Sequence, residues 1–284
     1  MNVDRALRDS INHRLANVAA ERHVAPDRIR RHFAFQRILV RLSATEGWVL
    51  RGGFALEIRL GLQARATKDL DLAMLDDLDG AEVQERLLDA LDVDADDELT
   101  FQVSAPKAIS PDEAGNPGWK FTVTSFLGGK VFAPLRLDVV ARSAEIEGAV
   151  GTLEVHPPIL PERLSSTTMP AVVVAQHAAE KFHAMARTYA GDRPSSRVKD
   201  LVDVVLLAEA GLLPHPDLPD RLRTVWQVRD GVPPPAQLPE LPASWTHDYA
   251  AMATELDLDI DYSTARSTAE RIYAEALATE ENHQ

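Results

Sequence analysis

The stretch that most constrains the fold is "KDLDLAML", residues 68–75, in which two aspartates interrupt an apolar run. Alternate residues of a β-strand face the same side, so Asp69 and Asp71 are predicted to point together while Leu70 and Leu72 enter the core. Carboxylates this close repel each other, and one is expected to stay protonated unless a cation lies between them. Carboxylates and phosphate oxygens are the usual ligands of Mg²⁺. The strand therefore predicts a metal site suited to phosphoryl chemistry.

A glycine pair precedes this strand. Gly52 and Gly53 follow a predicted strand at 48–50 and open a short predicted helix that ends near Gly61. Glycine lets backbone N–H groups approach a phosphate closely, and the positive end of a helix favours an anion. The pair therefore predicts a phosphate-binding turn.

A third carboxylate, Asp138, lies in the apolar segment "PLRLDVV". If this segment is a strand beside residues 69–72, the three carboxylates can meet. The alternative is an acid at a strand end that contacts water or Arg136. Both interpretations stay open from the sequence.

The pattern along the 284 residues alternates helix and strand up to about residue 140 and is helical afterwards. Two helices are expected before residue 43, and the proline-rich stretch 154–170 is expected to be an ordered connector. We predict an α+β protein with N-terminal helices packed on the core at 1–45, a core with a mixed sheet at 46–157 and a C-terminal helical domain at 158–284. Further elements are expected at 81–91 (helix), 99–109 and 119–127 (strands), 171–188 and 195–213 (helices), and 218–228 and 262–278 (helices).

Composition narrows the class of protein. The chain has no cysteine, which excludes disulfides and thiolate metal sites, and no apolar run long enough to span a membrane. The charged N-terminus does not resemble a secretory signal. We expect a cytoplasmic protein without a membrane partner, and a monomer because no sustained heptad pattern is present.

Charge is unevenly distributed. The formal net charge is −14, yet residues 1–68 hold 13 Lys and Arg against 6 Asp and Glu. Residues 69–100 hold 13 acidic residues and one arginine. A basic N-terminal third could guide a polyanion, although a solvated arginine-rich helix pair explains it equally well.

The helical half carries further candidates. Lys181 shares a predicted helix face with valine and methionine, so it either extends to solvent or contacts an anion. Asp200 and Asp203 lie one turn apart near the start of the next predicted helix, where acids are also favoured by the helix dipole. Arg65 and Lys68 flank the Asp-Leu-Asp strand and are candidates for contact with a polyanion.

These motifs together resemble the nucleotidyltransferases of the AbiEii/AbiGii toxin family, which include the MenT-type toxins. The similar features are Gly-Gly, a short helix and Arg-X-Thr-X-Asp-Leu-Asp-Leu, followed downstream by "AEKFHAMART" and "RVKDLVDVVLL". The resemblance covers roughly residues 45–210. It implies a small mixed sheet of the nucleotidyltransferase type, flanked by helices.

The resemblance implies roles for individual residues. Asp69, Asp71 and Asp138 would hold Mg²⁺ or Mn²⁺, and Lys181 and Asp200 would complete the catalytic set. Lys181 would also contact the triphosphate. The residues implied in nucleotide binding are Gly52, Gly53, Thr67, Lys68 and Lys181, and those implied in RNA contact are Arg65 and Arg197.

The function implied is a toxin that transfers a nucleotide from a nucleoside triphosphate to RNA, with the 3′ end of tRNA as the expected acceptor. A cognate antitoxin is the implied partner. Two alternatives stay open: transfer to a hydroxyl of a protein or small molecule, and a non-catalytic regulator that binds nucleotide or RNA.

Overall fold

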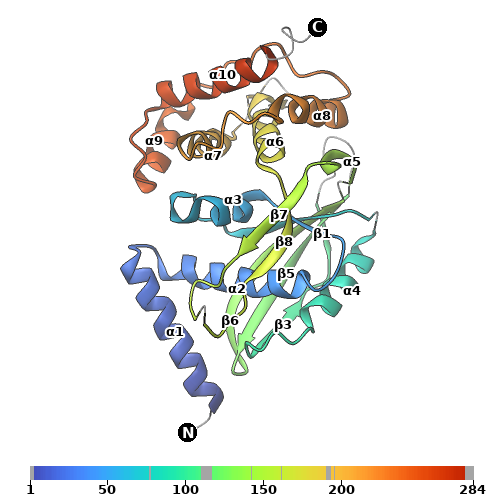
Figure 1. Ribbon diagram of the computed structural model, residues 1–284, viewed down its shortest axis with the longest axis vertical. Coiled ribbons are helices and arrows are strands. Elements are labelled where there is room, and N and C mark those ends of the chain that lie inside the picture. Colours follow the sequence, from blue (N-terminus) through green and yellow to red (C-terminus); the bar gives the residue numbers. More distant parts are fainter. Residues whose placement is uncertain are drawn as a thin grey trace. The chain divides into compact units, whose positions relative to one another are not determined.

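The structure is a computed structural model that describes residues 3–76, 78–109, 117–141, 143–160, 162–189, 193–194 and 196–278. The chain divides into two compact units. The first comprises Met1–Ile58, Ala66–Ser143 and Val150–Ala171, and the second comprises Arg59–Arg65, Ala144–Ala149 and Val172–Gln284. Figure 1 shows the strands of the first unit and the α6–α10 helices of the second.

The first unit is built on a mixed sheet with the strand order β3-β5-β6-β2-β1-β8-β7, in which β4 also pairs with β5. Strand β2 runs parallel to β6 and antiparallel to β1, and β1 runs parallel to β8. The strands are β1 Trp48–Arg51, β2 Asp69–Met74, β3 Leu99–Val103, β4 Lys107–Ile109, β5 Gly118–Leu127, β6 Lys130–Ala141, β7 Val150–Val155 and β8 Thr167–Val172.

The central strands are apolar on the side that faces the core, as the alternation predicted. Leu70, Leu72 and Leu137 are fully buried, which places their neighbours Asp69, Asp71 and Asp138 on the other side. Burying these side chains is the main force that fixes the register of β2 against β6.

Helices α1 Val3–Glu21, α2 Pro26–Leu42 and α4 Gly80–Leu91 belong to the same unit. Helix α2 begins with a proline, which is compatible with the first turn, and buries Phe33, Ile38 and Leu39. Helix α4 begins at Asp79 with a capping box shared with Glu82. Helix α1 contacts α2, and α2 and α4 contact the strands, so the predicted N-terminal helices are confirmed.

A buried ion cluster fastens α2 to the segment before β3. Asp97 accepts hydrogen bonds from Arg37 Nε at 2.6 Å and from both terminal nitrogens of Arg41 at 2.7 Å. All three side chains are almost completely buried. The arginines hold the pKa of Asp97 below its usual range even though burial opposes this.

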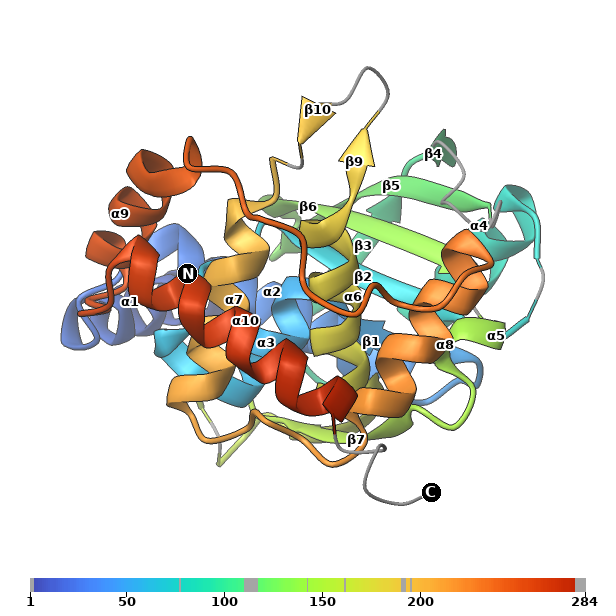
Figure 2. The same ribbon diagram turned by 90° about the horizontal axis from the view of Figure 1, so that it is seen from above.

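The second unit is helical. Helix α6 (Val174–Ala186) contacts α7 (Val198–Glu209) and α8 (Leu218–Asp230), and Figure 2 shows α10 (Tyr262–Ala278) lying across this group. Helix α9 (Trp245–Glu255) contacts α7 and α10. The 3-10 turn at Gly61–Gln63, the short helix α5 Ser143–Ile146 and the paired strands β9 Thr188–Tyr189 and β10 Arg193–Pro194 are the remaining elements. Helix α3 spans Gly52–Leu60, and its residues up to Ile58 belong to the first unit.

The α+β class is confirmed, and the differences from the sequence-based expectations are local. Strand β8 pairs with β1 and takes residues 167–170 from the expected connector and residues 171–172 from the expected helix, so that α6 begins only at Val174. Helix α9 was not predicted. Residues 110–116, between two of the expected strands, and residue 195, the first of the expected helix at 195–213, lie outside the described residues. No helix in the described ranges is long and apolar enough to cross a membrane.

Candidate active site

The turn between β1 and α3 requires glycine for steric reasons. Gly52 adopts a φ of +64°, which favours glycine, and a Cβ at this position would overlap the carboxylate of Asp71. A Cβ on Gly53 would lie 2.8 Å from the hydroxyl oxygen of Thr67. The backbone N–H of Gly53 donates a hydrogen bond to Asp71. The glycine pair therefore makes room for the Asp-Leu-Asp strand. Its predicted contact with phosphate stays a prediction.

A row of charged side chains crosses one side of the sheet. The register places Arg51 of β1 opposite Asp71 of β2, Asp71 beside Asp138 of β6, and Asp138 opposite Lys120 of β5. Residues paired in this way point to the same side of a sheet. Asp71 and Asp138 are thus neighbours flanked by a cation on each outer strand. The conditional prediction that β6 pairs beside residues 69–72 is confirmed.

A second row of charged side chains lies two residues away along the same strands, on the same side of the sheet. Asp69 is in register with Arg136, and the distance from Arg136 Nε to Asp69 Oδ1 is 3.3 Å. In the first row, Lys120 Nζ lies 3.2 Å from Asp138 Oδ2. Asp138 therefore has its ion pair with Lys120, a residue that the sequence analysis did not single out.

The local environment favours the protonated form of two of these carboxyls. Burial, with the Asp138 and Asp69 charges adding to it, raises the pKa of Asp71 to about 6 against the pull of Arg51 and the Gly53 amide. Burial also raises the pKa of Asp138, although Lys120 opposes it. Asp69 adds a repulsive charge in both cases.

Asp69, Asp71 and Asp138 supply carboxylate oxygens, which are the type of ligand that a hard divalent cation prefers. Asp69 Oδ1 and Asp138 Oδ1 are buried and accept no hydrogen bond from any described residue. A cation bound there would satisfy these oxygens and relieve the repulsion that raises the pKa of Asp71. Within the described ranges, however, no three carboxylate or imidazole groups converge as a ready metal site. Asp69 and Asp138 are instead drawn to Arg136 and Lys120, so metal binding would require these side chains to turn.

The loop that leads into β2 is braced from two helices. Glu57 of α3 accepts a hydrogen bond from the Thr67 backbone N–H at 3.3 Å and from Arg28 Nε at 2.8 Å. Arg31 Nε donates to the Thr67 carbonyl at 3.3 Å, and the Thr67 hydroxyl donates to the Asp69 carbonyl at 3.1 Å. Thr67 thus bonds the backbone of the turn, and its implied contact with nucleotide stays a prediction.

The sequence analysis did not identify Glu57 or Arg31, and the signal available was weak. Glu57 is only 3% exposed in a helix of nine residues, and one buried acid in an amphipathic helix carries no spacing that points to a loop. Lys68, predicted to bind nucleotide, is exposed.

In the second unit, Lys181 is buried and held by two carboxylates. Its Nζ lies 2.6 Å from Asp203 Oδ2 and 3.1 Å from Asp200 Oδ1. Arg65 donates two hydrogen bonds to Asp203, at 3.0 and 2.9 Å. Of the two interpretations of Lys181 drawn from the sequence, extension to solvent is therefore wrong, because the side chain is buried against the two carboxylates. Arg65, predicted to contact RNA, is bound by Asp203. Arg197 lies 3.8 Å from Asp200.

Charge pairing outweighs burial in this group. Burial alone would lower the pKa of Lys181, but Asp203 and Asp200 raise it. Burial likewise opposes ionisation of Asp203, yet Lys181 and Arg65 hold its pKa at about 2. His177, which is also buried, has a pKa well below its ordinary value because of burial and the neighbouring Lys181 charge. The group is therefore a fixed ionic network, and Asp203 contributes more to it than the sequence suggested.

Comparison with known proteins decides the family. The family described as nucleotidyl transferase AbiEii toxin of type IV toxin–antitoxin systems matches residues 34–273, which is most of the chain. The chain belongs to the AbiEii nucleotidyltransferase toxin family. The resemblance inferred from the motifs is thereby confirmed, and an AbiEii protein is a nucleotidyltransferase of a toxin–antitoxin system.

Solved structures support the AbiEii fold. MenT4, a nucleotidyltransferase toxin of Mycobacterium tuberculosis H37Rv, is 19% identical over 94% of this chain and 98% of its own, with a TM-score of 0.55. A candidate nucleotidyltransferase from H. pylori is 16% identical over 89% of this chain and 96% of its own, with a TM-score of 0.50. At these identities the likeness shows the fold alone. No curated protein matches the sequence.

Proposed function

We propose that this AbiEii protein transfers a nucleoside monophosphate from a nucleoside triphosphate to RNA, with the 3′ end of tRNA as the acceptor. The observation that supports the proposal most strongly is the row of Asp71 and Asp138, with Asp69 two residues away, on one side of the sheet beside the Gly-Gly turn. We also propose that a cognate antitoxin counters the protein and that it acts in the cytoplasm.

Asp69, Asp71 and Asp138 would hold Mg²⁺ or Mn²⁺, which when bound neutralises charge on the phosphates. The acceptor hydroxyl attacks the α-phosphorus, the bond from the α-phosphorus to the bridging oxygen of the β-phosphate breaks, and pyrophosphate leaves. The proton of the hydroxyl passes to a carboxylate oxygen, for which Asp138 is the proposed acceptor. A raised pKa suits a group that accepts a proton near neutral pH.

The protein's other residues would bind and orient the nucleotide. Gly52 and Gly53 place backbone N–H groups at the start of α3, where a phosphate is favoured. Glu57 and Arg31 keep the loop at Thr67 in place, so that Asp69 and Asp71 enter the strand at a fixed position. For Lys181 and Asp200 we propose a supporting role through the ionic network, with contact between Lys181 and the triphosphate as a prediction still to be tested.

RNA is the proposed acceptor because the family resemblance implies it, and the basic N-terminal third, with 13 Lys and Arg against 6 Asp and Glu in residues 1–68, is compatible with a polyanion. Arg5, Arg14 and Arg22 are exposed there. Charged side chains of this kind attract the phosphate backbone without reading sequence. They do not distinguish tRNA from other RNA.

The test combines purified protein, Mg²⁺, total tRNA and each α-labelled nucleoside triphosphate in turn. The inactive variant is Asp69→Asn with Asp71→Asn, and the matched control is Glu85→Gln, which changes an exposed carboxyl of α4. We expect label in tRNA with wild type and with the control but not with the double variant. Label in a protein or small molecule instead would retain the enzyme class and refute the acceptor. Absence of any label, with nucleotide binding intact, would favour the regulator alternative.

A further inference from the structure

Strand β3 leaves one edge of the sheet open. Among the described residues it is the terminal strand of the sheet and pairs with β5 alone, and β4 continues along the same side of β5. The backbone N–H of Leu99 donates to Asp97 and its carbonyl accepts from Arg41, so both groups point away from β5. Alternate residues repeat this direction, and the backbone groups of Phe101 and Val103 therefore point outward too. An open edge of this kind can pair with another strand.

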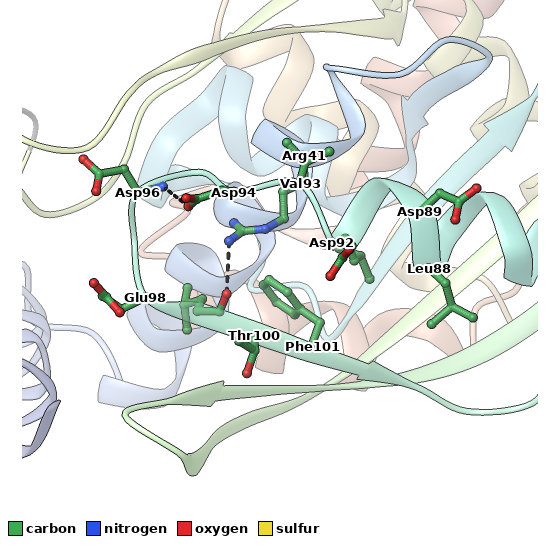
Figure 3. A pocket seen from close by; sticks show the side chains of 12 residues that line it. Arg41, Leu88, Asp89, Asp92, Val93, Asp94, Asp96, Glu98, Thr100 and Phe101 are labelled. Carbon is green, nitrogen blue, oxygen red and sulfur yellow. Dashed lines mark hydrogen bonds between the residues drawn. The ribbon is translucent and has the colours of Figure 1, made fainter.

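A groove of about 580 Å³ lies beside this edge (Figure 3). It is lined by the last turns of α4, by the segment 92–98 and by the first residues of β3. Leu88 and Val93 are 45% and 37% exposed, and half-buried Phe101 lies beside Arg41, whose guanidinium is 5.0 Å from the ring centroid. The groove thus offers apolar contact surface next to the outward-pointing backbone groups of Phe101.

The rim of the groove is strongly acidic. Five exposed carboxylates surround it: Asp89, Asp92, Asp94, Asp96 and Glu98. The lining contains one cation, Arg41, which shares the buried carboxylate of Asp97 with Arg37, so this ion cluster carries one net positive charge against the five carboxylates of the rim. The potential at the groove is therefore negative and favours a positively charged partner.

Arg41 adds an independent feature. The residue is only 2% exposed, and its Nε has no hydrogen-bond partner among the described residues. A buried N–H without an acceptor is costly, and a peptide carbonyl is a suitable acceptor. An acidic rim that favours cations and an unused donor that favours a carbonyl together match a basic peptide rather than a metal ion or a nucleic acid.

We propose that the β3 groove binds an extended segment of a partner protein in which lysine or arginine alternates with apolar residues. The segment adds as a strand to the outer edge of β3. Its apolar side chains contact Leu88, Val93 and Phe101, and its basic side chains meet the carboxylate rim. This surface is separate from the Asp-Leu-Asp strand, and the proposal does not depend on nucleotidyl transfer.

The first test measures binding of a labelled peptide of about eight residues, the length of a short strand, that alternates lysine with valine. Fluorescence anisotropy with the full-length protein at low salt compares it with a peptide that has glutamate in place of lysine. The groove variant combines Asp89→Asn, Asp96→Asn and Glu98→Gln, and the matched control combines Glu240→Gln, Asp248→Asn and Glu255→Gln. All six changes nearly conserve size and affect exposed side chains.

We expect the lysine peptide to bind wild type and the control, and the groove variant to bind it about tenfold more weakly. Added salt should weaken the binding. Equal binding of the glutamate peptide, or no loss in the groove variant, would overturn the proposal.

A second test addresses the strand pairing. A lysine peptide with an N-methyl group on every backbone amide retains its charge and side chains but has no N–H groups to pair with a strand edge. We expect this peptide to lose binding, and we expect hydrogen exchange at Phe101 and Val103 to slow only with the unmodified peptide. Unchanged binding of the methylated peptide, or no slowing at these two amides, would refute addition to β3.

Discussion

Replacing Asp71 with asparagine should stabilise the folded protein while it abolishes transfer. Asp71 carries a pKa of about 6 in the folded state against 3.8 as its ordinary value, because burial and two neighbouring carboxylates disfavour its charge. An asparagine keeps an oxygen that can accept the Gly53 N–H. The substitution removes the negative charge of Asp71, which costs free energy in the folded protein when no metal is bound.

The magnitude follows from linkage. A shift of about two pKa units corresponds to about 3 kcal/mol at pH 7.5, and structural relaxation reduces this to about 1–3 kcal/mol. Because the folded pKa lies above the unfolded one, the cost of Asp71 is fully present above pH 6 and fades as the pH falls towards 3.8. The gain from Asp71→Asn should therefore drop below about 1 kcal/mol at pH 4.

The assay is urea unfolding of wild type and Asp71→Asn at both pH values, with a chelator present. Glu85→Gln serves as the control because Glu85 is exposed, and it should change the free energy of unfolding little at either pH. A lower free energy of unfolding for Asp71→Asn at pH 7.5, or a gain that is the same at both pH values, would refute the reasoning.

Three further changes test other contacts. Gly52→Ala should lower stability and remove transfer because its Cβ would overlap Asp71. The control is Gly61→Ala: Gly61 has a similar φ of +62° and open space around it, so this change should lower the free energy of unfolding by only about 1–2 kcal/mol. Lys181→Met should cost about 3–5 kcal/mol in urea unfolding, since Asp200 and Asp203 lose their buried cation. Asp97→Asn should also lower the free energy of unfolding by about 3–5 kcal/mol because it leaves two buried arginines without their carboxylate. An unchanged urea midpoint in Lys181→Met or in Asp97→Asn would contradict the stabilising role of the ion cluster that the variant disrupts.

The sequence predicted the local structure well where the residue types allow only one placement, with apolar side chains in the core and charged side chains outside it. The alternation of Asp69 and Asp71 with leucines predicts both the strand and its orientation, and the structure buries Leu70 and Leu72 completely. Two interpretations of Asp138 were open from the sequence, and the structure supports the one in which its strand lies beside residues 69–72.

Other features depend on contacts between segments far apart in the chain. Lys120 and Arg136 pair with Asp138 and Asp69 only because β5, β6 and β2 are neighbours, and no local pattern encodes that order. Strand β8 was taken for part of a connector because residues 154–170 contain too many prolines for a helix. Helix α9, which follows a proline-rich stretch at 233–242, was not predicted.

The most direct test of the central claim is pyrophosphate release from nucleoside triphosphates in the presence of Mg²⁺ and tRNA, comparing wild type with Asp138→Asn. We expect wild type to release pyrophosphate only when both Mg²⁺ and tRNA are present, and we expect Asp138→Asn to lose this release although the variant folds and still binds nucleotide. Release by Asp138→Asn at the wild-type rate would contradict the assignment of this sheet face as the active site.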